Sequence, residues 1–103
     1  MPNTTLSILA QLGQRLRQAR ILKKETQEDL GTRIGVSRQV IARMEKGVPG
    51  TQLDNWLKVS DYLDLLSTWK DVMNIREDPF EKFDREKRLE QELRKKRVRR
   101  RKV

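Results

Sequence analysis

Apolar residues recur at intervals of three and four along most of the chain, which is the spacing of one buried helix face. The first such stripe consists of Leu9, Leu12, Leu16 and Ala19. No stretch alternates apolar and polar residues as a β-strand would. The pattern therefore predicts an all-α fold, with further helices at about 27–34, 38–46, 52–63 and 65–74. Thr51 is expected to cap the helix at 52–63.

Two short helices in this series are bounded by residues that commonly cap helices. Thr26 stands at the N-cap position of the first helix, and Gly35 ends it after about eight residues. Ser37 is the N-cap candidate of the second helix, which Gly47 ends. Two helices of this length separated by a glycine turn have the proportions of a helix-turn-helix unit at residues 27–46.

The second helix of this unit, at 38–46, has two distinct faces. A helical wheel directs Ile41, Met44 and Glu45 inward. The opposite arc is polar except for one alanine, and it consists of Arg38, Gln39, Ala42, Arg43 and Lys46. Arginine pairs with guanine and glutamine with adenine, each worth about 1–3 kcal/mol of discrimination, so this arc can read DNA, although alone it could be a solvated face. Val40, on the flank, can touch a thymine methyl or be buried.

The run from Thr26 to Gly47, TQEDLGTRIGVSRQVIARMEKG, resembles the Cro/CI-type (XRE) helix-turn-helix family. Members of that family carry a TQ-x-x-L-A…GVS…I-x-x-x-E-x-G pattern. The resemblance extends over about Leu9 to Leu63, roughly half of the chain. It implies a five-helix domain, here residues 1–74, that binds double-stranded DNA.

The resemblance also implies roles for individual residues. Gln27, at a helix N-terminus whose unpaired N–H groups suit an anion, would contact a DNA phosphate. Arg20 would form a structural ion pair with Glu45. Lys46 would add charge near the DNA backbone. The positions that would read bases, or in the case of Ser37 contact phosphate or base, are Ser37, Arg38, Gln39 and Arg43.

Two residues depart from the family pattern. Gly31 replaces the usual alanine, which lowers helix propensity by about 1 kcal/mol but permits close helix packing. Glu25 stands where the family prefers leucine, so the first loop is expected to pack loosely. Neither departure falls on the polar arc.

The positive charge of the chain is concentrated at its C-terminal end. The formal net charge is +9, yet residues 1–79 hold 12 basic and 10 acidic side chains. Within the extension at 75–103, residues 94–102 are basic at eight of nine positions. The extension is expected to be partly helical or disordered, with disorder in the basic tail at 94–103 because like charges repel. The tail would either add phosphate contacts or belong to an arm that folds on a partner protein.

The helix predicted at 65–74 has more apolar area than a terminal helix of a small domain needs. Its apolar residues are Leu65, Leu66, Trp69, Val72 and Met73. The segment is either the last core helix of a monomer or a dimer interface, and helix-turn-helix proteins commonly bind as dimers, so we expect a homodimer. Trp56 and Trp69 are expected in the core or at an interface, not as base-stacking platforms.

The composition excludes several classes of function. Cysteine and histidine are absent, which removes disulfides, zinc sites with thiolate or imidazole ligands, and the commonest nucleophiles and bases. Asp61 and Asp64 have no third ligand and are taken as surface acids. We expect no enzyme activity, no metal, no cofactor and no small-molecule ligand. No apolar run exceeds three residues, so we expect no membrane span and a cytoplasmic, nucleoid-associated protein.

These features together predict a transcriptional regulator, a dimeric repressor that binds an inverted-repeat operator. A looser resemblance to Hip-type regulators rests on the YLDLLSTW run and the DPF segment near the charged C-terminus. It implies an alternative, in which the protein is an antitoxin and co-repressor that binds a kinase-like toxin and autoregulates its operon. A third alternative is a non-specific basic protein associated with RNA or the ribosome.

Overall fold

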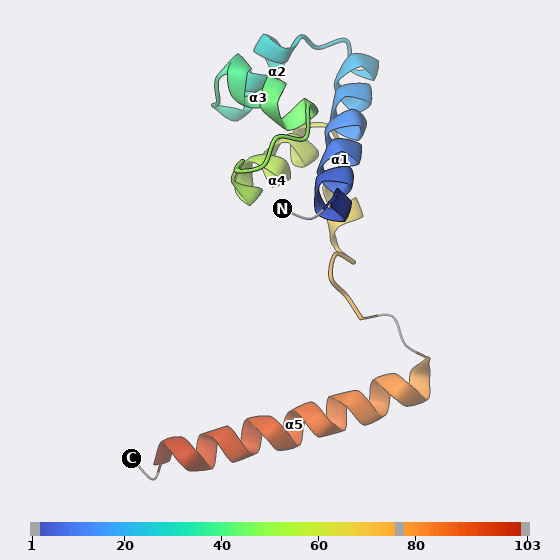
Figure 1. Cartoon of the computed structure of the whole chain (residues 1–103), viewed down its shortest axis with the longest axis vertical. Coiled ribbons are helices and arrows are strands. Elements are labelled where there is room, and N and C mark those ends of the chain that lie inside the picture. The colour runs from blue at the N-terminus through green and yellow to red at the C-terminus, as the bar shows by residue number, and fades with distance from the viewer. Residues whose placement is uncertain (1–2, 76–77, 102–103) are drawn as a thin grey trace. The chain divides into compact units, whose positions relative to one another are not determined.

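The computed structural model describes residues 3–75 and 78–101, with side chains up to residue 96. Within these ranges the chain is helical and has no strand, so the predicted all-α fold is confirmed (Figure 1). The helices are α1 (Asn3–Leu22), α2 (Gln27–Ile34), α3 (Arg38–Glu45), α4 (Leu53–Tyr62) and α5 (Pro79–Arg101), with a 3₁₀-helix, η1 (Leu66–Trp69), after α4. The chain divides into two compact units, Met1–Val72 and Met73–Val103.

One hydrophobic core holds the first unit together. α3 packs against both α1 and α2, and α2 packs against α4. The buried core residues are Leu16, Leu30, Ile41, Met44, Trp56, Val59 and Leu63. Because α2 and α3 have only eight residues each, they would be marginal as isolated helices and depend on this packing. The core therefore determines where the helix-turn-helix unit sits.

The segment at 65–74 is not the α-helix that the sequence predicted. Only Leu66–Trp69 is helical, and it is a single 3₁₀ turn. The chain then turns, and Met73 adopts a positive φ of 62°. The expected dimerisation helix is therefore wrong as an element, although its residues remain available for contacts.

Two side-chain hydrogen bonds explain the short turn. The Thr68 hydroxyl donates to the carbonyl oxygen of Leu65 at 2.6 Å, which competes with the α-helical bond to that carbonyl. The Trp69 indole N–H donates to Ser60 Oγ at 2.7 Å and holds η1 on α4. Tertiary contact with α4 thus outweighs the helical periodicity of the segment.

The second unit contains α5, a 23-residue helix with its own cap. Asp78 Oδ1 accepts a hydrogen bond from the N–H of Glu81 at 2.9 Å. Pro79 occupies the first helical position, where a missing N–H costs little. The Asp78 carboxylate and the proline together start the helix without help from a core.

The backbone of α5 stays helical as far as Arg101, so the expected disorder of the basic run is wrong for residues 94–101. Two ion pairs lead the helix into this run. Arg94 Nη2 lies 2.8 Å from Glu90 Oε1, four positions before it, and Lys95 Nζ lies 3.4 Å from Glu92 Oε1, three positions before it. The last two residues of the predicted tail, 102–103, lie outside the described residues.

In the two described ranges, no helix combines the length and the apolar character that a membrane span requires. The same ranges contain no group of three or more acidic, histidine or cysteine side chains that could hold a metal ion. Asp61 and Asp64 are both exposed, as expected for surface acids.

Candidate DNA-binding surface

The turn between α2 and α3 is fixed by hydrogen bonds at the helix ends. At the start of α2, Thr26 Oγ1 accepts from the N–H of Asp29 at 3.0 Å, and Asp29 Oδ2 accepts from the N–H of Thr26 at 3.1 Å. Gly35 ends α2 at φ 80°, a left-handed conformation that glycine adopts without strain. Ser37 Oγ then accepts from the N–H of Val40 at 3.3 Å and caps α3. The predicted helix-turn-helix geometry thus has local support on both sides of the turn.

Gly31 allows the turn to approach α2 closely. A Cβ atom at this position would lie 2.6 Å from the carbonyl oxygen of Val36, a distance that real side chains essentially never show. The alanine of the family pattern would therefore require a shift of the turn. The departure at Gly31 is matched by closer packing, as the sequence predicted.

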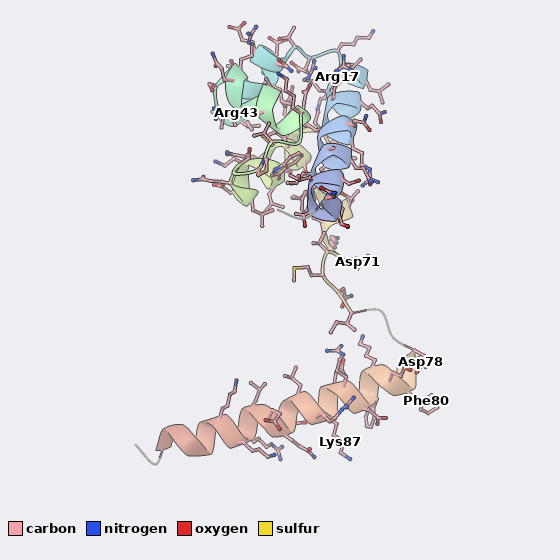
Figure 2. All side chains as sticks on the ribbon, viewed as in Figure 1. Arg17, Arg43, Asp71, Asp78, Phe80 and Lys87 are labelled. Carbon is pink, nitrogen blue, oxygen red and sulfur yellow. The ribbon has the colours of Figure 1, made fainter. Side chains whose placement is uncertain are left out.

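The polar face of α3 is exposed. Ile41 and Met44, on the opposite face, are completely buried, as the helical wheel predicted. The exposed residues are Arg38, Gln39, Arg43 and Lys46, while Ala42 between them is half-buried. In the described part of the chain, the ion pairs do not involve Arg38, Arg43 or Lys46. These cations, of which Arg43 is labelled in Figure 2, are therefore available to a polyanion.

A small polar hollow of about 130 Å³ lies beside this face, and the sequence did not predict it. Val40, which is half-buried against the core, and Arg43 line it from α3. Its other lining residues come from the following loop and the start of α4: Gly50, Thr51, Gln52 and Asn55. Thr51 does not cap α4 as expected, because the helix begins one residue later, after Gln52, without a side-chain cap. In the sequence, the polar residues that follow Pro49-Gly50 were the only feature that could have indicated this hollow.

A buried ion pair joins α1 to the end of α3. Arg20 Nε donates to Glu45 Oε2 at 2.6 Å, and Arg20 Nη2 donates to Glu45 Oε1 at 3.0 Å. The two side chains retain 11% and 3% of their exposure. The hydrogen bond to Glu45 raises the pKa of Arg20 above its usual value, so the guanidinium is firmly charged. The structure therefore contains the pair that the family resemblance implied.

Gln27 is held by the same glutamate. Its Nε2 donates to Glu45 Oε1 at 3.2 Å, and the side chain is half-buried at the N-terminus of α2. A primary amide has a second N–H, and the first N–H groups of the helix backbone also lack intrahelical partners. The Gln27 side chain is thus oriented with a donor left for an anion such as a phosphate.

The loop between α1 and α2 is not loosely packed, which corrects the expectation drawn from Glu25. The Tyr62 hydroxyl donates to the Glu25 carboxylate. Lys23 Nζ donates to the Tyr62 carbonyl oxygen at 2.6 Å and lies 4.1 Å from the centre of its ring. The hydrogen bond to Glu25 raises the pKa of Tyr62. These polar contacts replace the apolar packing that a leucine would provide.

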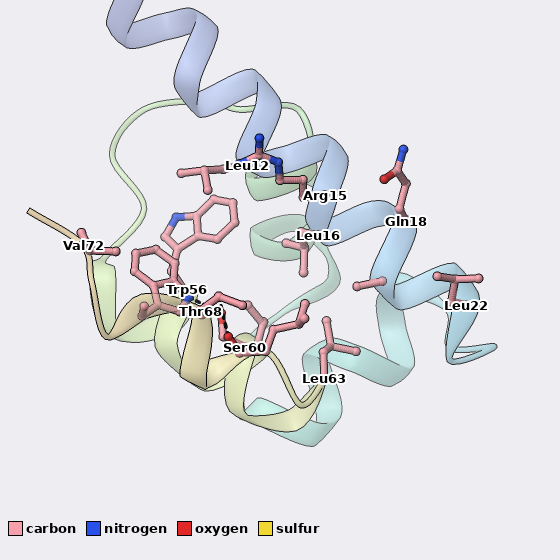
Figure 3. Close-up of a pocket in the computed structure, with 14 residues that line it drawn as sticks. Leu12, Arg15, Leu16, Gln18, Leu22, Trp56, Ser60, Leu63, Thr68 and Val72 are labelled. Carbon is pink, nitrogen blue, oxygen red and sulfur yellow. Dashed lines mark hydrogen bonds between the residues drawn. The ribbon is translucent and has the colours of Figure 1, made fainter. Parts of the chain in front are cut away.

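An apolar hollow of about 550 Å³ opens between α1, α4 and η1 (Figure 3). Leu12 and Leu16 line it from α1, and Trp56 lines it from α4. Three of the five residues expected at a dimer interface also line it, namely Leu65, Trp69 and Val72. Of the five, Trp69 is half-buried, whereas Leu65, Leu66, Val72 and Met73 are 37%, 42%, 54% and 95% exposed.

The fold and the exposed face of α3 define a helix-turn-helix DNA-binding protein. The family described as "Helix-turn-helix" matches residues 16–69, slightly more than half of the chain. The chain belongs to this family, in its Cro/CI-type (XRE) group. It is a DNA-binding transcriptional regulator.

One similar solved structure is that of the restriction-modification controller protein C.AhdI from Aeromonas hydrophila. The two chains are 35% identical, and the match has a TM-score of 0.54. It covers 58% of this chain and 87% of the controller protein. No curated protein sequence matches this chain.

Proposed function

We propose that this protein binds an inverted-repeat operator as a homodimer and represses transcription there. The observation that carries the proposal is the exposed, ion-pair-free polar face of α3, whose opposite face is fixed in the core. A helix held in this way can enter the major groove. Arg38 and Arg43 would pair with guanine, and Gln39 with adenine. The exposed part of the Val40 side chain would contact a thymine methyl group.

Contacts with the DNA backbone would orient the domain. Gln27, held by Glu45, would donate its second amide N–H to a phosphate. Ser37 and Lys46 lie at the two ends of α3 and are both exposed, which suits backbone contacts on either side of the groove. Such contacts set position and affinity, whereas the base contacts of α3 set specificity.

A second copy of the chain would cover the apolar hollow between α1, α4 and η1. Exposed apolar patches on small proteins commonly mark interaction sites. Covering Leu65 and Val72, which line the hollow and are exposed, would remove apolar side chains from water. A two-fold dimer would present two α3 helices to half-sites about 34–36 Å apart, which explains the expected inverted repeat.

Repression is the mode of action that needs the fewest contacts beyond DNA binding. A bound dimer would exclude polymerase from an overlapping promoter without any further activity. The similarity to a protein described as a controller supports a role in gene control. Action on chromosomal DNA would place the protein at the nucleoid, in the cytoplasm.

The experiment that tests this function is selection of bound sequences from random duplexes, followed by measurement of Kd for the selected site. Arg43→Ala is expected to weaken binding to that site by about 1–3 kcal/mol and to relax selection at one base position. The control is Arg17→Ala. Arg17 is also an exposed arginine, but it lies on α1 and not on α3, where Figure 2 labels Arg43. Equal losses in both variants, or selection that yields no shared sequence, would contradict the proposal.

The alternative role as an antitoxin has no comparable support. The similar structure is that of a restriction-modification controller, and neither the fold nor the comparisons point to a kinase-like toxin. The alternative would be reinstated if a kinase-like protein, encoded next to the gene of this chain, copurified with it from cells that express both.

A further inference from the structure

α5 has no face suited to burial in a protein groove. Its described side chains are exposed except for Arg85, which is half-buried. At 100° per residue, Phe80 lies about 140–180° around the helix from Leu89 and Leu93, and Phe83 lies about 80–120° from them. A helix that docks in a groove needs apolar residues on one stripe, at i, i+3, i+4 and i+7. The pattern of α5 therefore does not favour a protein partner.

The charges of α5 differ between its two parts. Residues 79–93 contain four basic and five acidic residues, so that part is close to neutral. Arg94 and Lys95 pair with Glu90 and Glu92. No acidic residue follows Glu92 in the sequence, and pairing along a helix reaches only three or four positions. The last part of α5, residues 97–101, therefore holds four basic residues and no acidic one.

The density of positive charge in this last part matches that of duplex DNA. Residues 97–101 are helical and basic at four of five positions. At a rise of 1.5 Å per residue they extend over about 7.5 Å. Duplex DNA carries one negative charge per about 1.7 Å of its axis, hence about four over the same length.

We propose that residues 97–101 of α5 bind the phosphate backbone of duplex DNA without sequence preference. This role rests on the proposed DNA-binding function and adds a second contact outside the family domain, which ends at residue 69. It raises the affinity for operator and non-operator DNA alike, because phosphates carry no direct sequence information. It also makes binding more dependent on salt, because each neutralised phosphate releases counterions.

The test uses the full-length chain and a random-sequence duplex, so that no operator needs to be known. The variant carries Arg97→Gln, Arg99→Gln, Arg100→Gln and Arg101→Gln. The matched control carries Lys82→Gln, Arg85→Gln, Lys87→Gln and Arg88→Gln, which removes the same four charges from the part of α5 that also holds acidic residues. Fluorescence anisotropy gives Kd at several salt concentrations, and circular dichroism at 222 nm checks the helix content of each protein.

In the C-terminal variant, the negative slope of log K against log salt is expected to become shallower by about 3 to 4, and binding is expected to weaken roughly tenfold or more. The control is expected to change the slope by less than about 1. Equal changes in both variants would mean that only net charge matters, and would overturn the proposal. Preferential binding of a single-stranded RNA of the same length would overturn it as well. If site selection fails while the slope still falls in the C-terminal variant, the operator function is wrong and the role of α5 stands.

Discussion

Glu45 is the residue on which the placement of the candidate surface depends. It lies at the end of α3 and accepts hydrogen bonds from Arg20 of α1 and Gln27 of α2. One carboxylate thus connects three helices. The pair with Arg20 follows from the family pattern, but the bond from Gln27 does not, because the sequence gives no distance between residues 18 positions apart.

Replacing this carboxylate should destabilise the domain strongly. Glu45→Gln leaves the buried Arg20 guanidinium without a counter-charge, which is expected to lower the free energy of unfolding by about 3–5 kcal/mol. Urea denaturation at neutral pH measures the change. Glu28→Gln, at an exposed position in the first turn of α2, is the control and should cost less than about 1 kcal/mol. Similar values for the two variants would show that the ion pair contributes little.

Glu25 shows where residue-level reasoning fails. Hydropathy alone indicates that a carboxylate packs poorly at a position that usually holds leucine. That reasoning misses the hydroxyl of Tyr62, which is 37 residues away in the sequence. In the folded chain this hydroxyl donates a hydrogen bond to the Glu25 carboxylate.

At the scale of elements, α2 and α3 were predictable because their ends are coded locally. Thr26, Gly35 and Ser37 each act within a few residues of their own position, so the sequence is sufficient to place them. η1 was not predictable in the same way. Its length depends on Trp69, whose indole N–H donates a hydrogen bond to Ser60 on α4.

The cap of α2 should make stability depend on acid pH. The hydrogen bond from the Thr26 backbone N–H, with that residue's hydroxyl, holds the pKa of Asp29 below its usual value. A carboxyl with a lowered pKa stabilises the fold above its unfolded value of about 3.9, and this contribution is lost as pH falls through the folded pKa. Asp29→Asn should therefore show a smaller loss of unfolding free energy below pH about 4 than the parent protein.

Urea denaturation at pH 7 and at lower pH measures this difference. Asp54→Asn is the matched control, because Asp54 lies in the first turn of α4, where no side-chain cap is formed. An acid dependence in Asp29→Asn equal to that of the parent would contradict the role of the cap.

At the scale of the whole molecule, assembly is the property that decides how the α3 face is used. Val72 lines the apolar hollow, whereas Ile8 does not, and both side chains are 54% exposed. If a second copy covers the hollow, Val72→Glu should shift the protein toward the monomer, because burial of a charge opposes association. Ile8→Glu should leave the association constant nearly unchanged.

Sedimentation equilibrium at micromolar concentration, with and without DNA, measures this assembly. The parent chain is expected at twice the monomer mass of 12.3 kDa. A monomer mass under both conditions, or equal effects of the two substitutions, would exclude the hollow as a dimer interface.

The sequence by itself determined the all-α class, the two short helices with their caps, and the polar face of α3. These depend on helical periodicity and on contacts between near neighbours in the chain, which are written directly in the order of residues. Only the tertiary structure decided that η1 is a single turn, that Glu25 holds the first loop, and that polar residues around Gln52 lie next to Arg43. Each of these depends on a partner from a different element, and the distance to such a partner exists only after the core has brought the helices together.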